Sequence, residues 1–407
     1  MQKLPIESVR PGMVLAKTLY SERGDVLLSR GVTLTELYIS GVVQHGYQFI
    51  WVQDGVADDV EPPEVLSPKL RNLANKHLHD IFSTMESICS VQDLGQQREL
   101  LINFARTARP QFAALCEDAE QIVENVAYAE LLSGMVSLRN HDSYTYDHSL
   151  EVATAGVLLG HRLFLSPQEM YQLALGCLCH DIGKLIIPKA ILNKPSNLFR
   201  EELAIIRQHP EAGYTTAQHL MGASDIIARH IVRQHHERQD GTGYPRGLRG
   251  SNRFIAGKRA FGQGLILPVA EVAAVADVYC ALAFDRPYRK AFPPDQIVTT
   301  LLSMAGKHLN REIVARFLTI LPVYPIGTRV VVISSKLRGY RGIVTDVHPA
   351  HLARPTVRIV FDPQGKSVAP FEVDTSRERE IEIATAPYAR LAGFDSETAE
   401  LMPGAWG

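Results

Sequence analysis

Short apolar runs alternate with turn-forming residues at the start of the chain. The stretch "RPGMVLAKTLYSERGDVLLSRGVTLT" has turn signals at Pro11-Gly12 and Gly31, and "QFIWV" follows as a further strand. Residues 1–60 are therefore predicted to form a small β-rich module. The next stretch, "DGVADDVEPPEVLSP", is acidic and contains proline, which is typical of a linker.

From Pro68 onward the apolar residues recur at helical spacing. In "LRNLANKHLHDIFSTM" the repeating face consists of Leu70, Leu73, His77, Ile81 and Met85. The later stretch "AEQIVENVAYAELLSGMVSL" has the same rhythm. We interpret residues 61–139 as a linker and a helical segment, whose apolar face either joins a helix bundle or forms a homodimer contact.

Residues 140–322 are predicted to be almost entirely helical. Ser166-Pro167 followed by Glu169 predicts a helix start with a capping box, and His209-Pro210 predicts another start. After Pro322, three β-branched runs separated by glycine and proline predict a small, barrel-like antiparallel β-module over 323–385, followed by a tail over 386–407. The predicted fold class is multidomain and mainly α, with a helical core and small β-rich N-terminal and C-terminal modules.

Composition narrows the class of protein. Hydrophobic residues make up 46% and charged residues 21% of the 407 residues, with a formal net charge of −2, so we expect no nucleic acid polymer as a partner. The five cysteines are mostly in apolar helical contexts, which indicates reduced thiols and a cytoplasmic protein. The most apolar stretch, Leu265 to Phe284, carries Glu271 and Asp277, so we expect a buried helix and no membrane span.

The helical block also carries a set of metal-ligand residue types. Neutral imidazoles and carboxylates are ligands for divalent transition metals, although a single histidine is usually structural. Seven such residues exceed what one ion requires, so the set suits two. Asp181, beside His180, is the carboxylate expected to be shared between two ions, which together would activate a bridging hydroxide for attack on a phosphodiester. The seven are His148, His180, Asp181, His209, His235, His236 and Asp277.

Three motifs carry a family resemblance. "CHDIGKLIIPKAILNKPSNL", "HHERQDGTGYP" and "ADVYCALAFDRPYRK" occur in this order between about Asp142 and Ala291. They resemble the HD-domain metallophosphohydrolases, and in particular the HD-GYP family. The resemblance implies an HD-type helical core and a cyclic di-GMP phosphodiesterase, which produces pGpG, GMP or both. It also implies two divalent metal ions, with iron the first expectation and Mn, Ni, Co or Zn as alternatives.

The resemblance places family roles on individual residues. The metal ligands fall on the seven histidines and aspartates given above. Asp181 and Lys184 are the expected catalytic residues, and Lys184 also matches a lysine near the substrate phosphate. Because Lys184 lies four residues after His180, we expect both on one helical face. Substrate contacts are expected at Lys184, Tyr244, Arg286 and Arg289.

Several positions depart from the family pattern or extend it. Some relatives carry a glutamate where this chain has Tyr144, so we expect two metals and not three, and His141-Asp142 does not fit the ligand pattern. "SNRFIAGKRAFGQGLIL" contains an insertion, which is either a lid or a solvated loop. Gly241 and Gly243 permit a tight turn before Tyr244, and Glu237-Arg238 is expected to form an internal salt bridge.

Two alternative functions remain open at the level of sequence. The first alternative to a cyclic di-GMP phosphodiesterase is a catalytically silent cyclic-dinucleotide-binding signalling module. The second is an HD-type phosphohydrolase with another nucleotide substrate. The presence of all seven ligands argues against the first alternative, and the "GYP" turn and "DRPYRK" argue against the second. The N-terminal module is a candidate contact for a signalling partner.

Overall fold

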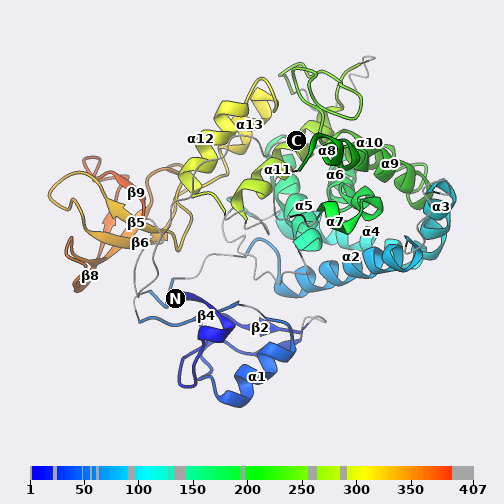
Figure 1. The fold of residues 1–407 in the computed structure, drawn as a ribbon. Coiled ribbons are helices and arrows are strands. Elements are labelled where there is room, and N and C mark those ends of the chain that lie inside the picture. Colours follow the sequence, from blue (N-terminus) through cyan, green and yellow to red (C-terminus); the bar gives the residue numbers. More distant parts are fainter. Residues whose placement is uncertain are drawn as a thin grey trace.

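The structure is a computed structural model in which helices predominate (Figure 1). It describes residues 2–21, 25–47, 49–55, 57–60, 64–89, 97–127, 129–132, 144–192, 194, 198–254, 264–284 and 291–386. Within these ranges the side chains of residues 2–3, 85–89, 97–101 and 144–146 are not described. The predicted class, a mainly helical multidomain chain with a β-rich module near each end, is confirmed.

The N-terminal module consists of short strands and one helix. Strand β1 (Gln2–Pro5) pairs antiparallel with β4 (Phe49–Val52), and β2 (Leu19–Tyr20) pairs with β3 (Val26–Leu28). A 3-10 turn (Ile6–Ser8) follows β1, and helix α1 (Glu36–Gln44) begins where the Thr35 side chain accepts a hydrogen bond from the backbone of Tyr38. The module has an apolar core of its own, formed by Val9, Leu15, Leu19, Leu34, Val42, Ile50 and Val52.

The helical body is built around one continuous apolar core that runs from Val65 to Leu321. Because the helices before residue 130 share this core with the later ones, we propose that residues 65–321 form one helical unit. Its helices are α2 (Pro68–Cys89), α3 (Gln97–Thr107), α4 (Arg109–Val126), α5 (Tyr144–Arg162), α6 (Pro167–Cys179), the 3-10 helix η4 (Ile182–Ile186), α7 (Lys189–Leu192), α8 (Arg200–Ile206), α9 (His209–Leu220), α10 (Ile226–Gln234), α11 (Pro268–Ala283), α12 (Pro294–Met304) and α13 (Arg311–Phe317).

Local sequence explains where several of these helices begin. Ser166 and Glu169 form the expected capping box at the start of α6, and Pro210 lies in the first turn of α9, so both predicted starts are confirmed. Almost every residue of α11 is buried, which explains its unbroken apolar sequence. No helix in the described part of the chain is both long and apolar enough to cross a membrane.

The apolar face of α2 packs into the body, as the bundle interpretation predicts, but its buried face is rotated from the predicted one. Leu70, Ala74, Leu78 and Ile81 are buried, whereas the ring of His77 is only partly buried. His77 Nδ1 lies 2.7 Å from the buried carboxylate of Asp118 on α4. A homodimer contact remains a proposal.

The C-terminal module is a five-stranded antiparallel sheet with the strand order β8-β7-β6-β5-β9. Within the described residues β8 and β9 lie at the two edges of the sheet and do not pair with each other. The expected barrel-like form stays a prediction. Valines and isoleucines fill one apolar cluster on it. The strands are β5 (Arg329–Val332), β6 (Arg341–Asp346), β7 (Thr356–Phe361), β8 (Ser367–Asp374) and β9 (Ile383–Thr385), and the predicted tail from residue 387 lies outside the described residues.

The linker after the N-terminal module contacts the C-terminal sheet. The carboxylate of Asp59 lies 2.7 Å from the guanidinium of Arg358 on β7, and that of Asp54 lies 3.3 Å from Arg329 on β5. Ala57 and Val60 share a small apolar cluster with the sheet. Two parts of the molecule that are far apart in sequence are therefore joined through this linker (Figure 1).

Candidate metal centre

All seven predicted metal ligands lie together in the central body, most of them at or near the ends of helices. Their donor atoms form two groups, and within each group every atom is within 4.8 Å of the others. One group consists of Asp181, His209, His235 and His236, and the other consists of His148, His180 and Asp277. His180 directly follows α6, Asp181 precedes η4, His209 begins α9, His235 directly follows α10, and His148 and Asp277 lie on α5 and α11.

Asp181 lies between the two groups. Its Oδ1 is 3.4 Å from Nε2 of His209 and 3.9 Å from Nε2 of His235. Its Oδ2 is 3.3 Å from Nε2 of His180 and 3.9 Å from Nε2 of His148. Each carboxylate oxygen therefore faces a different group, which is the arrangement that a carboxylate shared by two ions requires.

The remaining distances define the interior of each group. His209 Nε2 and His235 Nε2 are 3.3 Å apart, and Asp277 Oδ1 is 3.0 Å from His148 Nε2 and 3.9 Å from His180 Nε2. Six of the seven side chains are buried, and His236 is partly buried. The centre is therefore a largely enclosed space lined by ligand atoms.

Hydrogen bonds to the backbone orient three of the imidazoles. The Nδ1 atoms of His180, His209 and His235 lie 2.7, 2.8 and 2.9 Å from the carbonyl oxygens of Cys177, Ile206 and Val232. A carbonyl oxygen only accepts, so each Nδ1 must carry the proton and donate. This leaves Nε2 as the atom that faces the centre with a lone pair, as in metal-binding histidines whose second nitrogen is fixed by a backbone carbonyl.

The protonation states of most ligands also suit a metal. Burial lowers the pKa of His148 and His235 to about 4 and that of His209 to about 3. Burial acts to raise the pKa of Asp181 and Asp277, but the surrounding imidazoles, together with Lys184 for Asp181, hold it well below the usual range. Metal ligands must be neutral imidazoles or ionised carboxylates, and these are the forms favoured here at neutral pH.

Two buried atoms of the centre have no hydrogen-bond partner within the described residues. They are Nε2 of His180 and Oδ1 of Asp181, which belong to different groups. Burying such atoms without a partner costs about 1–3 kcal/mol each. The pKa of His180, unlike that of the other imidazoles, is raised. Burial acts to lower it, but the charges of Asp181 and Asp277 outweigh burial. The donor set and the orphaned atoms together fit divalent metal ions.

Lys184 lies at the edge of the centre. Helix α6 ends at Cys179 and Lys184 lies in the 3-10 helix η4, so the prediction that Lys184 and His180 share an α-helical face is wrong. The tighter turn brings Nζ of Lys184 to 2.7 Å from Oδ2 of Asp181. Its side chain is 31% exposed, so this cation faces both the bridging carboxylate and solvent.

The "GYP" turn closes over the first group. The ring of Tyr244 stacks on that of His236, with centroids 4.7 Å apart and an angle of 29° between the planes. The Tyr244 hydroxyl is buried and has no hydrogen-bond partner among the described residues. A Cβ at Gly243 would lie 2.4 Å from the backbone nitrogen of Arg238, so a residue larger than glycine does not fit there.

The expected salt bridge between Glu237 and Arg238 is wrong. The carboxylate of Glu237 instead accepts hydrogen bonds from the backbone nitrogens of Arg246 and Leu248, both at 2.8 Å. These bonds tie the residues after the turn to the residues before it. The adjacent opposite charges of Glu237 and Arg238 suggested an ion pair, and nothing in the sequence indicated that Glu237 would bind backbone amides nine and eleven residues away.

Some predicted residues lie outside the described part of the chain. These are Arg286, Arg289, His141, Asp142 and most of the insertion, residues 255–263, while only the backbone of Tyr144 is described. The residues before the gap in the insertion are anchored to α13: the backbone of Phe254 donates to Glu312, and the side chain of Asn252 accepts from the backbone of Arg311. Whether the insertion forms a lid stays a prediction.

Sequence reasoning missed the close packing at Gly183. A Cβ at this position would lie 1.9 Å from the carbonyl oxygen of His209 and 2.5 Å from the nitrogen of Gly213. The absence of a side chain therefore lets η4 approach α9, which brings Asp181 and His209 together. The available signal was the glycine of "HDIGK", directly between two site residues.

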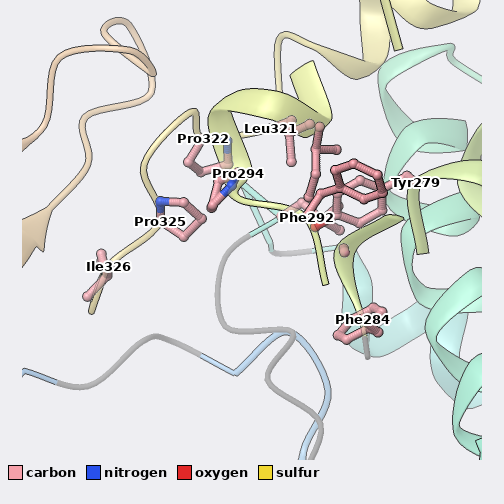
Figure 2. Close-up of a pocket in the computed structure, with 11 residues that line it drawn as sticks. Tyr279, Phe284, Phe292, Pro294, Leu321, Pro322, Pro325 and Ile326 are labelled. Atoms are coloured by element: carbon pink, nitrogen blue, oxygen red, sulfur yellow. The ribbon is translucent and has the colours of Figure 1, made fainter. Parts of the chain in front are cut away.

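A separate cavity of about 140 Å³ lies beyond the C-terminal end of α11 (Figure 2). Tyr279 and Phe284 line it from α11 and the residue after it, and Pro322, Pro325 and Ile326 line it from the connection to the C-terminal sheet. None of the seven ligand residues is among the residues that line it. It is therefore distinct from the metal centre.

Fold and site together define a class of protein. It is a helical metal-binding domain in which histidines and aspartates from the ends of several helices converge on one buried centre. The family model of the HD domain matches residues 104–313, about half of the chain. The chain belongs to the HD domain family, and the predicted membership of the HD-GYP family is confirmed.

The chain is similar to named relatives in bacteria. The cyclic di-GMP phosphodiesterase PA4108 of Pseudomonas aeruginosa is 27% identical over 98% of this chain and 93% of its own length. The 3'3'-cGAMP-specific phosphodiesterase 2 of Vibrio cholerae is 30% identical over 49% of this chain and 34% of its own length. The cyclic di-GMP phosphodiesterase response regulator RpfG of Xanthomonas campestris pv. campestris is 33% identical over 37% of this chain and 36% of its own length.

Proposed function

We propose that this chain is a metal-dependent phosphodiesterase that hydrolyses cyclic di-GMP. The observation that carries the proposal is the position of Asp181, whose two carboxylate oxygens face two separate ligand groups. The name of the Pseudomonas aeruginosa relative, which is similar over nearly the whole chain, supports cyclic di-GMP as the substrate. The products are pGpG, GMP or both.

The proposed cofactor is a pair of divalent transition-metal ions, with iron first and Mn, Ni, Co or Zn as alternatives. One ion would be held by Asp181, His209, His235 and His236, and the other by Asp181, His148, His180 and Asp277. Such a pair supplies an activated water nucleophile and neutralises charge on the attacked phosphoryl group. The three histidines fixed through Nδ1 keep their Nε2 atoms in place for this role.

Basic side chains and one tyrosine of this protein would position the substrate. Lys184, already 2.7 Å from Asp181, would place a positive charge beside the scissile phosphate and the leaving oxygen. Tyr244 closes one side of the centre through its stack on His236. Arg286 and Arg289 are proposed as further contacts on the strength of the family motif alone.

A mixed cyclic dinucleotide is the second candidate substrate. Several relatives are named 3'3'-cGAMP-specific phosphodiesterases, with identities of 30% to 34% to this chain. These matches cover less than half of the chain, whereas the cyclic di-GMP phosphodiesterase of Pseudomonas aeruginosa covers 98% of it. We therefore favour cyclic di-GMP. A cytoplasmic location, a homodimer and a signalling partner at the N-terminal module remain predictions.

The test is a turnover assay on protein purified without oxygen, with its metal content measured in the same sample. We expect conversion of cyclic di-GMP to pGpG or GMP, and no conversion by the His180→Ala/Asp181→Ala double variant. Binding of cyclic di-GMP without turnover, with Fe, Mn, Ni and Co each supplied, would instead identify a silent binding module. Faster cleavage of 3'3'-cGAMP would favour the second substrate.

A further inference from the structure

Two arginines near the metal centre have no carboxylate within ion-pair distance in the described part of the chain. Arg207 follows the last residue of α8, two residues before His209, and Arg238 lies two residues after His236. Among the described residues neither guanidinium forms an ion pair or a side-chain hydrogen bond, and the side chain of Arg207 is exposed. A guanidinium is always charged, so each carries a positive charge that no described carboxylate contacts directly.

The nearby carboxylates are already engaged elsewhere. Glu211 binds Arg233 through both oxygens, at 2.6 and 2.8 Å, and Glu237 accepts backbone hydrogen bonds from Arg246 and Leu248. Asp240 accepts from the backbone and hydroxyl of Thr242. Among the described residues, none of these three carboxylates forms an ion pair or a hydrogen bond with Arg207 or Arg238.

Tyr244 links both arginines to the metal centre. The guanidinium of Arg207 lies over the Tyr244 ring, with its Cζ 5.5 Å from the ring centroid, and the same ring stacks on His236. Burial raises the pKa of Tyr244, and the carboxylates of Asp181 and Asp277 raise it further, while the charges of Arg207 and Arg238 act in the opposite direction. Arg207 therefore contacts the ring directly, and Arg238 lies beside the turn that carries it, because a Cβ at the neighbouring Gly243 would be 2.4 Å from the backbone nitrogen of Arg238.

The contact with Tyr244 orients Arg207 without occupying its donors. This ring contact is not a hydrogen bond, and among the described residues nothing accepts from the Arg207 side chain, so its N–H groups remain available for a ligand. A planar group with free donors suits a phosphate, which it binds through two parallel hydrogen bonds. Arg207 contacts Tyr244, which in turn stacks on the predicted ligand His236, so a phosphate bound by Arg207 would be a second one beside the phosphate at the metals.

We propose that Arg207 and Arg238, positioned around Tyr244, form a subsite for the second phosphate of the cyclic dinucleotide, the phosphate that is not being cleaved. This inference rests on the proposed function and adds a specificity determinant to it. The subsite would make the enzyme prefer substrates with two phosphates over simple phosphodiesters.

Kinetics on two substrates test the subsite. Cyclic di-GMP has two phosphates, and bis(p-nitrophenyl) phosphate has one. For the Arg207→Ala and Arg238→Ala variants we expect KM for cyclic di-GMP to rise about 10- to 100-fold, the effect of losing charge-assisted hydrogen bonds. The loss of kcat/KM on bis(p-nitrophenyl) phosphate should be at least tenfold smaller than the loss on cyclic di-GMP. Arg207→Lys should recover part of the loss, because an ammonium keeps the charge without the planar fork.

Arg200→Ala is the matched control, because Arg200 is the first residue of α8, the helix that Arg207 follows, and its side chain is also exposed. It should change neither substrate's KM. Equal losses on both substrates, or no loss on either, would overturn the subsite.

A third measurement separates this proposal from the proposed function. If the wild-type protein cleaves bis(p-nitrophenyl) phosphate but not cyclic di-GMP, the proposed function fails. The subsite is then judged by inhibition of that cleavage by pGpG, which also carries two phosphates. An inhibition constant that rises about tenfold or more in Arg207→Ala supports the subsite, and an unchanged constant refutes it.

Discussion

Asp181 is the residue on which the metal centre depends most. Its two oxygens lie 3.3 Å and 3.4 Å from His180 and His209, which belong to different ligand groups. The carboxylate is buried, and its ionised form is maintained by the imidazoles and by Lys184. Removing its charge while keeping its shape should therefore affect both groups at once.

We expect Asp181→Asn to lose at least one of the two metal ions per chain and about 100-fold or more in activity, because an amide is a poor bridging ligand. Metal analysis and turnover of the same sample measure both effects. Asp225→Asn is the control, because Asp225 is a buried acid that binds Gln172 and the backbone of Gly222. It should lower stability but keep the metal content of the folded protein; full metal content in Asp181→Asn would contradict the assigned role.

Gly183 should be intolerant of any side chain. In Gly183→Ala the new Cβ would meet the carbonyl oxygen of His209, and backbone atoms cannot move aside cheaply. We expect a loss of about 3 kcal/mol or more in the free energy of unfolding, together with weaker metal binding, since η4 and α9 must separate.

Gly41→Ala is the matched control for this change. Gly41 lies within α1, and a Cβ added to it would meet no atom within 4 Å, so alanine there should stabilise the protein by about 0.5–1 kcal/mol. Chemical denaturation measures both variants. A Gly183→Ala protein as stable as the wild type would show that the two elements are not packed as described.

At the scale of elements, α2 holds the start of α5 in place. The side-chain amide of Asn75 on α2 donates to the carboxylate of Asp147 at 2.6 Å, and Asp147 precedes the ligand His148. Three residues earlier on α2, Asn72 donates to the backbone of Ser21 in the N-terminal module. Helix α2 therefore touches both the module and the element that carries a metal ligand.

Asn75→Ala should lower the free energy of unfolding by about 2 kcal/mol and weaken metal binding, because it removes a hydrogen bond to a charged acceptor beside His148. The control is Asn72→Ala, which lies one turn away on the same helix and makes a longer bond of 3.4 Å. It should have a smaller effect on stability and none on metal content. Equal metal content in both variants would mean that α2 does not position the ligand.

Glu271 on α11 predicts a pH dependence of stability. Burial raises its pKa to about 7, although the amides of Gln239 and Asn310 donate to it at 2.6 and 2.8 Å and act in the opposite direction. Since the ordinary value is 4.5, the folded state binds this proton more tightly than the unfolded state. The stability contributed by Glu271 is therefore full below about pH 4.5 and is lost as pH rises through about 7.

The comparison is between wild type and Glu271→Gln, unfolded with urea at several pH values from 5 to 8. The wild type should lose stability relative to the variant by up to about 3 kcal/mol across this range, and the difference should level off above pH 7. Because both proteins share the histidine cluster, its titration cancels in the difference. A difference that is constant with pH would contradict the buried, raised pKa.

Sequence reasoning was most reliable where one local rule dominates. The starts of α6 and α9 were predictable because capping by Ser166 and proline at position 210 act within a single turn. The seven predicted ligand residues were identified from motifs, and their side chains do converge. Three features could not be predicted, because each depends on packing between segments distant in sequence. These are the hydrogen-bond partners of Glu237, the 3-10 turn that carries Lys184, and the rotated face of α2.

At the scale of the whole molecule, the linker between the N-terminal module and α2 is held by the C-terminal sheet. Asp54 and Asp59 pair with Arg329 and Arg358, and Ala57 packs beside Ile343. No local pattern could have predicted these contacts, which join residues about 275 to 299 positions apart. The N-terminal module is therefore tied to the rest of the molecule in two ways, by its contact with α2 and by the linker that binds the C-terminal sheet.

The most direct test of this account is a crystal structure of protein prepared without oxygen, with anomalous scattering measured at the absorption edge of the bound metal. We predict two peaks about 4 Å apart, one on each side of the Asp181 carboxylate. A single peak, or imidazoles too far apart to enclose two ions, would contradict it.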